Sequence, residues 1–387
     1  MDPSSLHADW HYPTSIRFGA GRIRELPDVC RLLGITRPLL VTDPGLAALP
    51  MLQAIVALNE AAGLPTAVFS AIRPNPTDAN VEDGRAVYRR GGHDGIIAVG
   101  GGSALDTGKT IALLAGTPEP IWDVGPDWAR IPAARIAPVV AVPTTAGTGS
   151  EVGRAAVITR TATRTKEIPF HPGMMPKAVL ADPELTLSLP PHLTAGTGMD
   201  ALAHHLEAFC APYYHPMADG IAVEGMRRIK DWLPVAYRDG THREARAHML
   251  AAALMGAVAF QKGLGVIHAL SHPVGALYDT HHGLTNAVFM PYALAFNRPA
   301  IEERMIRLAR YLDLPQARFE AVLDWTLALR ETLGVPHTLA ELGVDDAHLD
   351  TLVAQATADP TAADNPVPLD APALRRLFVN ALEGRLV

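Results

Sequence analysis

Histidines are concentrated in residues 263–283, "GLGVIHALSHPVGALYDTHHG", a stretch that otherwise reads as an apolar helix followed by a turn. His268 and His272 stand at positions i and i+4, so they share one face of that helix. The pair His281–His282 comes just before a glycine, where the turn returns another imidazole toward the same place. Buried polar groups need partners, so this segment predicts a metal site or a set of hydrogen-bonded core histidines.

An earlier segment, "TGMDALAHHLEAF", repeats this spacing with Asp200 and His204 at i and i+4. His205 points about 100° away from His204 on a helix and is the poorer partner for Asp200. One carboxylate and three imidazoles with an open position suit a divalent Fe, Zn or similar transition metal that acts as a Lewis acid. For any one of these histidines alone, a hydrogen-bonded core residue is the competing interpretation. No H-E-x-x-H motif is present, so the zinc-protease pattern does not apply.

A glycine loop, "AVGGGSALDTGKT" (98–110), follows a strand-like run and opens a helix. Its glycines allow a ligand to approach the backbone closely. Ser103 is expected to cap the helix, with Asp106 three residues later as in a capping box, and the free N–H groups suit a pyrophosphate. The spacing does not fit a Walker loop, because five residues rather than four separate Gly102 from Gly108. It does not fit the G-x-G-x-x-G fingerprint either, because Leu105 stands where a glycine is required. A plain strand-to-helix turn is therefore the alternative.

A second polar loop, "PTTAGTGSE" (143–151), also follows an apolar run. Two such loops at the carboxyl ends of parallel strands predict a cradle for a phosphate-bearing ligand. Asp43 ends the run "LLVTD", where its carboxylate can accept hydrogen bonds from a ribose diol. The same charge would repel a 2′-phosphate and favour NAD over NADP. The competing interpretation of Asp43 is a turn residue before "PG".

The chain changes character near residue 185. Before it, strand-like runs (37–43, 65–70, 94–100, 137–143, 155–160 and 177–183) alternate with helical segments (51–62, 78–92 and 103–115). This alternation predicts a mostly parallel sheet with helices on both faces. After 182–191 the strand signals stop, and an all-helical region is expected, with 358–370 as a Pro-rich surface connection. We expect two domains, 1–185 for NAD and 186–387 for metal and catalysis, with a ligand in the cleft between them.

Composition narrows the function classes. The 387 residues are 48% hydrophobic and carry a net charge of −7, which argues against a nucleic-acid partner, since such a partner requires a basic face. Two cysteines are too few for a disulfide scaffold or a cysteine-based zinc site and fit a reducing cytoplasm. The N-terminal "MDPSSLHADWHYP" does not resemble a signal peptide. The longest apolar stretch, 249–260, is about half the length of ~20 residues that a membrane span needs, and predicts a buried helix.

The motifs "GGGSALDTGK", "PTTAGTGSE", "GMDALAHHLEAF", "GLGVIHALSHPVGALYDTHHGLTNA" and "RPNPT" (73–77) together resemble the iron-dependent (group III) alcohol dehydrogenases over nearly the whole chain. The resemblance implies an N-terminal dinucleotide-binding α/β domain and an all-α C-terminal domain, in a dehydroquinate synthase-like architecture. It implies the metal ligands Asp200, His204, His268 and His282, so that His282 is preferred over His281. It makes His272 the histidine that does not bind the metal and lies near the nicotinamide. The implied cofactor contacts are Asn75, Gly101, Gly102, Ser103, Asp106, Thr144, Thr145, Thr148, Lys166 and Leu180.

The activity that follows is a metal-dependent, NAD(H)-linked alcohol dehydrogenase or aldehyde reductase that works as a homodimer or larger homo-oligomer. Hydride passes between a substrate carbon and the nicotinamide, and His272 serves as the proton shuttle. Two alternatives are a non-redox NAD- and metal-dependent enzyme of the dehydroquinate synthase-like superfamily, and a catalytically silent NAD-binding or assembly protein. Steady reduction of NAD by an alcohol would distinguish the three.

Two cationic residues suggest the chemical class of the substrate. Many relatives carry a neutral residue where this chain has Lys262 and an apolar one where it has Arg154. Both are expected to face the cleft, with Phe260 as the third candidate substrate residue. Cations in a closed, low-dielectric site are costly without an anion, so we expect a small substrate with a carboxylate, such as an ω-semialdehyde acid or its hydroxy acid. The alternative is that they pair with local acids, such as Glu151 or Asp279, or reach solvent.

Overall fold

The computed structural model describes residues 11, 14–125 and 127–386. Two compact units are present: an α/β unit (Pro13–Thr145 with Gly149–Ser188) and a helical unit (Leu189–Val387 with Ala146–Thr148). Except for His11, the N-terminal segment in which we expect no signal peptide lies outside the described residues. The predicted architecture, a mostly parallel α/β part and an all-α part, is confirmed.

The α/β unit is built on a parallel sheet in the order β1-β8-β5-β4-β2-β3. Four inner strands, β2, β4, β5 and β8, are buried along their whole length. This explains why they are continuous runs of Val, Ile, Leu and Ala, as in a parallel sheet that is covered on both faces. The bounds are β1 Ser15–Phe18, β2 Pro38–Val41, β3 Ala67–Phe69, β4 Gly95–Gly100, β5 Val139–Pro143 and β8 Ala178–Ala181.

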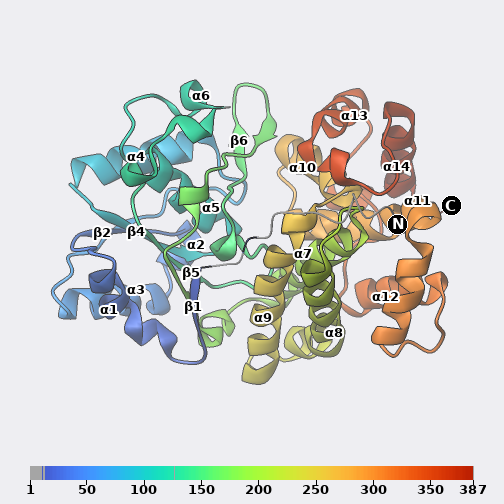
Figure 1. The fold of residues 1–387 in the computed structure, drawn as a ribbon, viewed down its shortest axis with the longest axis horizontal. Helices are drawn as coiled ribbons and strands as arrows, with labels where there is room; N and C mark the ends of the chain where they lie inside the picture. The colour runs from blue at the N-terminus through green and yellow to red at the C-terminus, as the bar shows by residue number, and fades with distance from the viewer. Residues whose placement is uncertain (1–10, 12–13, 126, 387) are drawn as a thin grey trace. The chain divides into compact units, whose positions relative to one another are not determined.

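Helices cover both faces of this sheet (Figure 1). α1 (Leu26–Leu32) and α3 (Pro50–Ala61) share one apolar core with alternate sheet residues such as Leu40, Ile97 and Val140. α5 (Gly102–Leu114) packs on the opposite face, where a Cβ on Gly108 would lie 2.9 Å from that of Ala98. α4 (Asp78–Arg90) lies beside α5. Crossover connections between parallel strands are right-handed. A connection that runs one way along the sheet therefore lies on one face, and a connection that runs the other way lies on the opposite face.

The direction of these connections reverses between β2 and β4. The chain leaves β2 toward the edge strand β3 and leaves β4 toward β5 on the other side. In open α/β sheets, ligands bind outside the carboxyl ends of the strands at such a switch point. Asp43 follows β2 and Gly101 follows β4. The fold therefore brings Asp43 and the glycine loop to this position.

Two features of the α/β unit differ from the sequence expectation. The strand expected at 155–160 is β6 (Ile158–Arg160), which does not join the parallel sheet but forms an antiparallel hairpin with β7 (Thr165–Glu167). β1 was not expected and forms the sheet edge beside β8. The β1–β8 pairing joins segments that are far apart in the sequence, and the β6–β7 pairing depends on a short turn. Hydrophobic periodicity predicts neither. Two one-turn helices, α2 (Pro44–Ala47) and α6 (Ile121–Val124), complete the unit with 3₁₀ turns that include η5 (Ser150–Val152).

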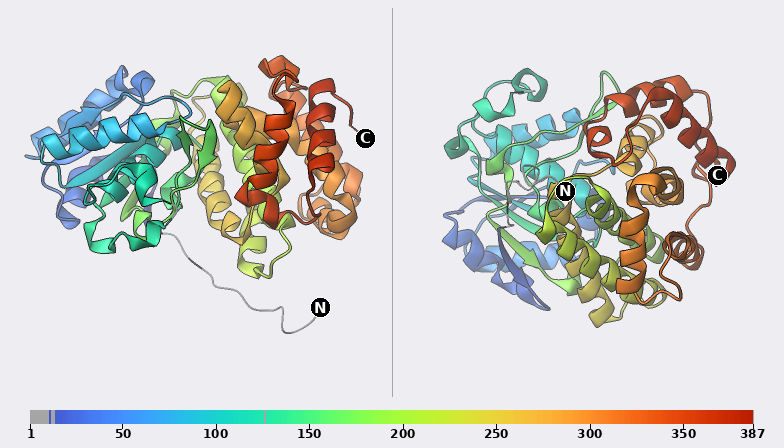
Figure 2. Two further views of the ribbon diagram at one scale, coloured as in Figure 1. Left: turned by 90° about the horizontal axis from the view of Figure 1, so that it is seen from above. Right: turned by 45° about the vertical axis from the view of Figure 1, so that its right-hand side comes forward.

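The helical unit contains no strand among its described residues, as predicted. α7 is buried on nearly every side, and its neighbours approach closely: a Cβ on Gly225 of α8 would meet the ring of His205 at 2.0 Å. Both views in Figure 2 show these helices side by side. The bounds are α7 Pro191–Cys210, α8 Pro216–Arg238, α9 Arg243–Ala259, α10 Val266–Tyr278, α11 His282–Tyr311, α12 Phe319–Thr332, α13 Leu349–Ala358 and α14 Ala371–Glu383, with 3₁₀ turns η8 (Phe260–Lys262), η9 (Ala340–Leu342) and η10 (Pro360–Asp364).

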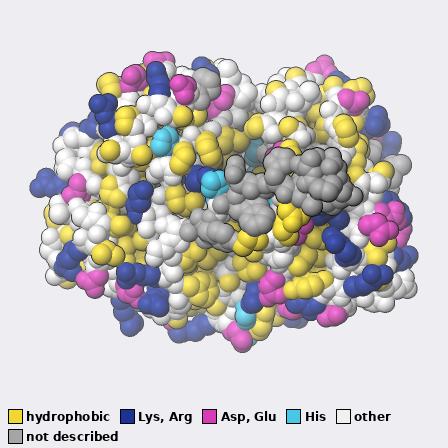
Figure 3. All heavy atoms as spheres, viewed as in Figure 1, with side chains coloured by type: hydrophobic (Ala, Val, Ile, Leu, Met, Phe, Trp, Pro, Cys, Tyr) yellow, Lys and Arg dark blue, Asp and Glu magenta, His cyan; other side chains and the backbone are white. Residues whose placement is uncertain are grey.

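The apolar stretch at 249–260 lies largely within α9, and most of its side chains are buried, as expected. In the described part of the chain, no single helix has both the length and the apolar composition of a membrane span; only the bent pair Arg243–Lys262 and Val266–Tyr278 meets that test jointly. On the face shown in Figure 3, acidic and basic side chains are interspersed, without a large patch of one sign.

Candidate metal and cofactor sites

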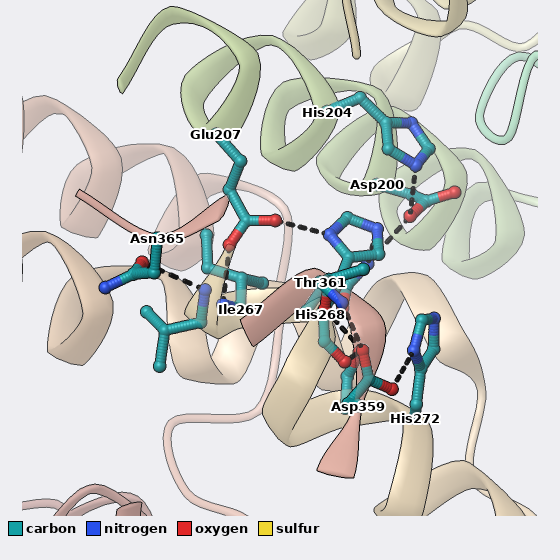
Figure 4. A network of polar contacts seen from close by, with 12 residues as sticks. Asp200, His204, Glu207, Ile267, His268, His272, Asp359, Thr361 and Asn365 are labelled. Atoms are coloured by element: carbon teal, nitrogen blue, oxygen red, sulfur yellow. Dashed lines mark hydrogen bonds and ion pairs between the residues drawn. The ribbon is translucent and has the colours of Figure 1, made fainter. Parts of the chain in front are cut away.

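A compact cluster of potential ligands lies inside the helical unit (Figure 4). Asp200 and His204 come from α7 and His268 from α10, and one potential ligand atom from each lies within 4.8 Å of the others. Nε2 of His282, the first residue of α11, is 3.5 Å from Oδ1 of Asp200, and Nε2 of His204 is 3.8 Å from the same oxygen. The structure therefore brings together all four ligands that the sequence motifs imply.

The charges of this cluster fit a divalent metal. Asp200 is 2% exposed, and its ion-pair partners among the described residues are imidazoles rather than lysine or arginine. Burial lowers the pKa of His204 to about 4, despite the attraction of Asp200, so that imidazole carries no charge at neutral pH. A buried carboxylate is costly without a cation. A mixed oxygen and nitrogen donor set suits Fe²⁺ or Zn²⁺.

The neighbouring histidines have other tasks. His281 is the N-cap of α11, and its Nδ1 accepts a hydrogen bond from the backbone N–H of Leu284 at 3.3 Å. His205 turns into the helical core, where its Nε2 lies 2.9 Å from the carbonyl oxygen of Ala252. Burial lowers the pKa of both. These positions support the choice of His282 over His281 and of His204 over His205.

His272 is held by a residue that the sequence did not single out. Its Nδ1 lies 2.8 Å from Oδ2 of Asp359, and its ring stacks on that of His282 with centroids 5.6 Å apart. Burial opposes ionisation of Asp359, but the charge and hydrogen bond of His272 and hydrogen bonds from Thr361 outweigh it, so the pKa of Asp359 lies below its usual value. The segment 358–370 is therefore not merely a surface connection, because Thr361 and Asn365 are also buried.

Two further residues support the ligands. Glu207 accepts hydrogen bonds from the imidazole of His268 and from the backbone N–H of Ile267. Burial disfavours a charged His268, but Glu207 outweighs it and raises the pKa of that imidazole. Asn286 donates to Oδ1 of Asp200 at 2.8 Å. Asn286 stands four residues after His282, so the i and i+4 spacing could have found it, whereas Asp359 has no local signal.

In the α/β unit, the glycine loop starts α5 differently from the prediction. The N-cap is Gly101, and no side chain caps the helix, so the expected capping box of Ser103 and Asp106 is wrong. Ser103 instead donates to the carbonyl oxygen of Pro74, and Asp106 accepts from the Ser150 hydroxyl and from the backbone N–H of Val157. The helix start thus keeps N–H groups that no side chain of the described residues caps, as an anion site requires. Through these bonds Asp106 connects α5 to the end of the polar loop 143–151 and to the segment after it.

The two polar loops of the α/β unit are in contact. The backbone N–H of Thr144 donates to the carbonyl oxygen of Gly100 at 3.0 Å. A Cβ on Gly101 would lie 3.2 Å from the side chain of Thr145, which explains why glycine stands there. Gly102 follows as the first residue of α5.

The remaining predicted cofactor residues have different surroundings. Oδ1 of Asp43 caps α2 through the N–H of Leu46, while Oδ2 would lie 3.7 Å from a Cβ on Gly100. Asn75 accepts from Lys166 at 2.7 Å. Thr148, a residue of the polar loop 143–151, groups with the helical unit. The side chain of Leu180 is completely buried in the core beneath α1 and α3, so a cofactor contact at this position would have to come from its backbone.

The three candidate substrate residues have different surroundings. The ammonium of Lys262 is buried and lies 2.5 Å from Asp219, so the chain itself supplies its anion, although not from Glu151 or Asp279. The argument from an unpaired cation therefore does not hold for Lys262. The guanidinium of Arg154 lies over the ring of Phe170 at 5.4 Å and forms no ion pair with any residue that the structure describes. The ring of Phe260 lies 5.0 Å from that of His204, beside the metal cluster.

Comparison with known proteins identifies the family of this chain. The profile "Iron-containing alcohol dehydrogenase" matches residues 13–183, and "Fe-containing alcohol dehydrogenase family, C-terminal" matches 194–382. The 4-hydroxybutyrate dehydrogenase of Cupriavidus necator is 42% identical over 96% of this chain and 99% of its own length. The crystal structure of a 1,3-propanediol oxidoreductase has a TM-score of 0.90 at 33% identity, over 97% of this chain and 100% of its own.

A sulfoacetaldehyde reductase from Bifidobacterium kashiwanohense, solved in complex with NAD⁺, has a TM-score of 0.88 at 28% identity, over 97% of this chain and 99% of its own. These matches confirm the resemblance found in the sequence and the reaction class that it implies, a metal-dependent, NAD-linked alcohol dehydrogenase. The chain belongs to the iron-containing alcohol dehydrogenase family.

Proposed function

We propose that this protein interconverts a small, carboxylate-bearing alcohol and its aldehyde with NAD(H), using 1–185 for the cofactor and 186–387 for the metal and the chemistry. The observation that carries the proposal is the buried cluster of Asp200, His204 and His268, joined by His282 and flanked by His272. Anaerobic reconstitution with Fe²⁺ or Zn²⁺, followed by NAD reduction with a panel of alcohols, tests it. Metal-bound protein that reduces no NAD with any alcohol would favour a non-redox enzyme of the same architecture.

Each group has one task in this reaction. Asp200, His204, His268 and His282 would hold a divalent metal, which supplies a Lewis acid for the substrate oxygen. Bound NAD⁺ would supply the hydride acceptor for oxidation of the alcohol to the aldehyde, and the hydroxyl proton would pass to a group of the chain. His272, whose Nδ1 is occupied by Asp359, has Nε2 left to accept that proton. The ring of Phe260 lies against that of His204, and Asp200, His204 and His268 are each at most 5% exposed.

Asp43 is proposed to favour NAD over NADP, because its carboxylate would repel a 2′-phosphate. Asp43→Gly should narrow the preference, but it would also remove the cap of α2; Asp43→Asn removes the charge and keeps a capping oxygen. We expect Asp43→Asn to lower the ratio of kcat/KM for NAD over NADP about tenfold, equivalent to about 1.4 kcal/mol. Steady-state kinetics with both cofactors measure this ratio. A wild-type enzyme that is more efficient with NADPH would contradict the assignment.

Two observations support the carboxylate on the substrate. The relative with 42% identity is a 4-hydroxybutyrate dehydrogenase, whose named substrate carries a carboxylate at the end opposite its hydroxyl. In this chain Arg154 keeps a charge that no acidic side chain of the described residues neutralises. Arginine recognises carboxylates through two parallel hydrogen bonds. Arg154 is therefore the proposed carboxylate anchor, and a terminal semialdehyde acid or its hydroxy acid is the proposed substrate.

Arg154→Gln should weaken use of carboxylated aldehydes and leave neutral aldehydes of equal length unaffected. A hydrogen bond to a charged group contributes about 1.5–3 kcal/mol, so we expect KM for the carboxylated substrate to rise about tenfold or more. Arg160→Gln is the matched control, since Arg160 also lies over an aromatic ring, that of Trp122, at 5.6 Å. Wild-type enzyme that prefers the neutral aldehydes, with an unchanged preference in Arg154→Gln, would refute the anchor.

We propose that the enzyme is located in the cytoplasm and that its oligomeric state is a homodimer or a larger homo-oligomer. Cys30 and Cys210 are both buried as free thiols, which suits a reducing compartment. Sedimentation equilibrium would measure the mass of the assembly.

A further inference from the structure

Helix α10 carries two histidines one turn apart, and each meets a buried carboxylate from a distant segment (Figure 4). Nδ1 of His268 lies 2.5 Å from Oε2 of Glu207, a residue of α7 that is 61 positions away in the sequence. Nδ1 of His272 lies 2.8 Å from Oδ2 of Asp359, just before η10 and 87 positions away. None of these four side chains is more than 7% exposed, so water does not compete for these contacts.

The second oxygen of each carboxylate is held by the backbone. Oε1 of Glu207 accepts from the N–H of Ile267 at 2.6 Å. Oδ1 of Asp359 accepts from the N–H and the hydroxyl of Thr361, at 2.9 and 2.6 Å. A backbone N–H can only donate, so these bonds orient each carboxyl group and leave its other oxygen as the acceptor for an imidazole.

We infer that Glu207 and Asp359 are positioning residues that fix the tautomers of His268 and His272, each with its proton on Nδ1 and its lone pair on Nε2. An ionised carboxylate has no proton to donate, so the imidazole must supply one. The amide nitrogen of Asn286, a donor, lies 3.4 Å from Nε2 of His268 and agrees with a lone pair there.

The two fixed tautomers serve different purposes. The free Nε2 of His268 belongs to the cluster with Asp200 and His204, so Glu207 makes it available to a metal. The free Nε2 of His272 can take the hydroxyl proton of the substrate, a role that rests on the proposed function. One helix thus presents two equivalent imidazoles, and two carboxylates from different segments prepare one for the metal and the other for the proton.

Amide substitutions should reverse each tautomer without changing the size of the side chain. In Glu207→Gln the amide oxygen must stay on the N–H of Ile267, so the amide NH₂ faces Nδ1 of His268. In Asp359→Asn the N–H of Thr361 imposes the same orientation toward His272. Because NH₂ can only donate, each imidazole must accept at Nδ1 and move its proton to Nε2.

The experiment combines tautomer assignment, metal affinity and turnover. Two-bond ¹H–¹⁵N spectra of ¹⁵N-histidine protein loaded with Zn²⁺, which is diamagnetic, should show wild-type His272 protonated at Nδ1 and His268 protonated at Nδ1 with Nε2 on the metal. Glu207→Gln should weaken Zn²⁺ binding about 10- to 100-fold. Asp359→Asn should bind Zn²⁺ within about threefold of wild type but lose about 100-fold or more in kcat, with the imidazole of His272 protonated at Nε2.

A control separates tautomer control from general support of the fold. Asn365→Ala removes the side-chain acceptor of the first N–H of α10, on Val266, but touches no imidazole. We expect it to lower the unfolding midpoint while Zn²⁺ affinity and kcat stay within about threefold of wild type.

Three results would overturn the inference. One is a wild-type His268 or His272 with its proton on Nε2, which needs no variant that folds. Another is a Glu207→Gln protein that binds Zn²⁺ as tightly as wild type. The third is an equal loss of Zn²⁺ affinity in Glu207→Gln, Asp359→Asn and Asn365→Ala, which would mean general support of α10. If wild type reduces no NAD, the proposed function fails, while tautomers and Zn²⁺ affinity still decide this inference.

Discussion

Replacing His282 with alanine is expected to empty the metal site and abolish turnover. His282 contributes one of four candidate ligands and is 3.5 Å from Asp200. The binding free energy of a structural zinc ion with four ligands is about 12 kcal/mol, so the loss of one ligand corresponds to about 3 kcal/mol of binding free energy. Affinity for the metal should therefore fall more than a hundredfold. His268→Ala should have the same effect. Metal content after dialysis, followed by NAD-linked turnover, measures both consequences.

His281→Ala is the matched control for this prediction. It removes the neighbouring imidazole, which caps α11 through the backbone N–H of Leu284. We expect it to cost about 1 kcal/mol of stability through the lost cap and to leave most of the metal bound. Loss of metal from His281→Ala together with retention in His282→Ala would reverse the assignment of the pair.

Gly283→Ala should damage both the fold and the metal site. A Cβ at Gly283 would lie 2.1 Å from the carbonyl oxygen of Gly196 and 3.0 Å from Cβ of Asp200. The clash is with the backbone of α7, so the start of α11 must move, and His282 moves with it. We expect a loss of about 3 kcal/mol in the free energy of unfolding and a weaker metal site. Urea unfolding of the metal-free protein and metal titration measure the two effects separately.

Gly220→Ala makes the same substitution where space is open. Gly220 lies in α8, and beyond its chain neighbours and the backbone of its own helix no heavy atom of the described residues lies within 4 Å of the Cβ that would be added. Alanine favours a helix over glycine by about 1 kcal/mol, so this variant should be as stable as wild type or slightly more stable. Equal unfolding midpoints for the Gly220 and Gly283 variants would show that the close approach of α11 to α7 is not required.

Local spacing in the sequence was sufficient for much of the molecule. Short apolar runs alternating with helical segments predicted the parallel sheet, and the loss of strand signals near residue 185 predicted the helical part. Asp200 with His204, and His268 with His272, could be recognised because residues four apart share a helix face whatever the helix packs against. The same rule would have identified Asn286 after His282.

The tertiary structure decided which partner each polar group meets. Glu207 and Asp359 reach His268 and His272 from 61 and 87 residues away, and Lys262 meets Asp219 across 43. Hydrophobic pattern and helix periodicity specify which face of an element is buried, but not which buried face of another element packs there. Whether His268 and His272 present Nε2, and whether a cation such as Lys262 is already neutralised, depends on those packing partners. The sequence therefore determined which chemical groups are available, and helix packing determined their tautomers and charges.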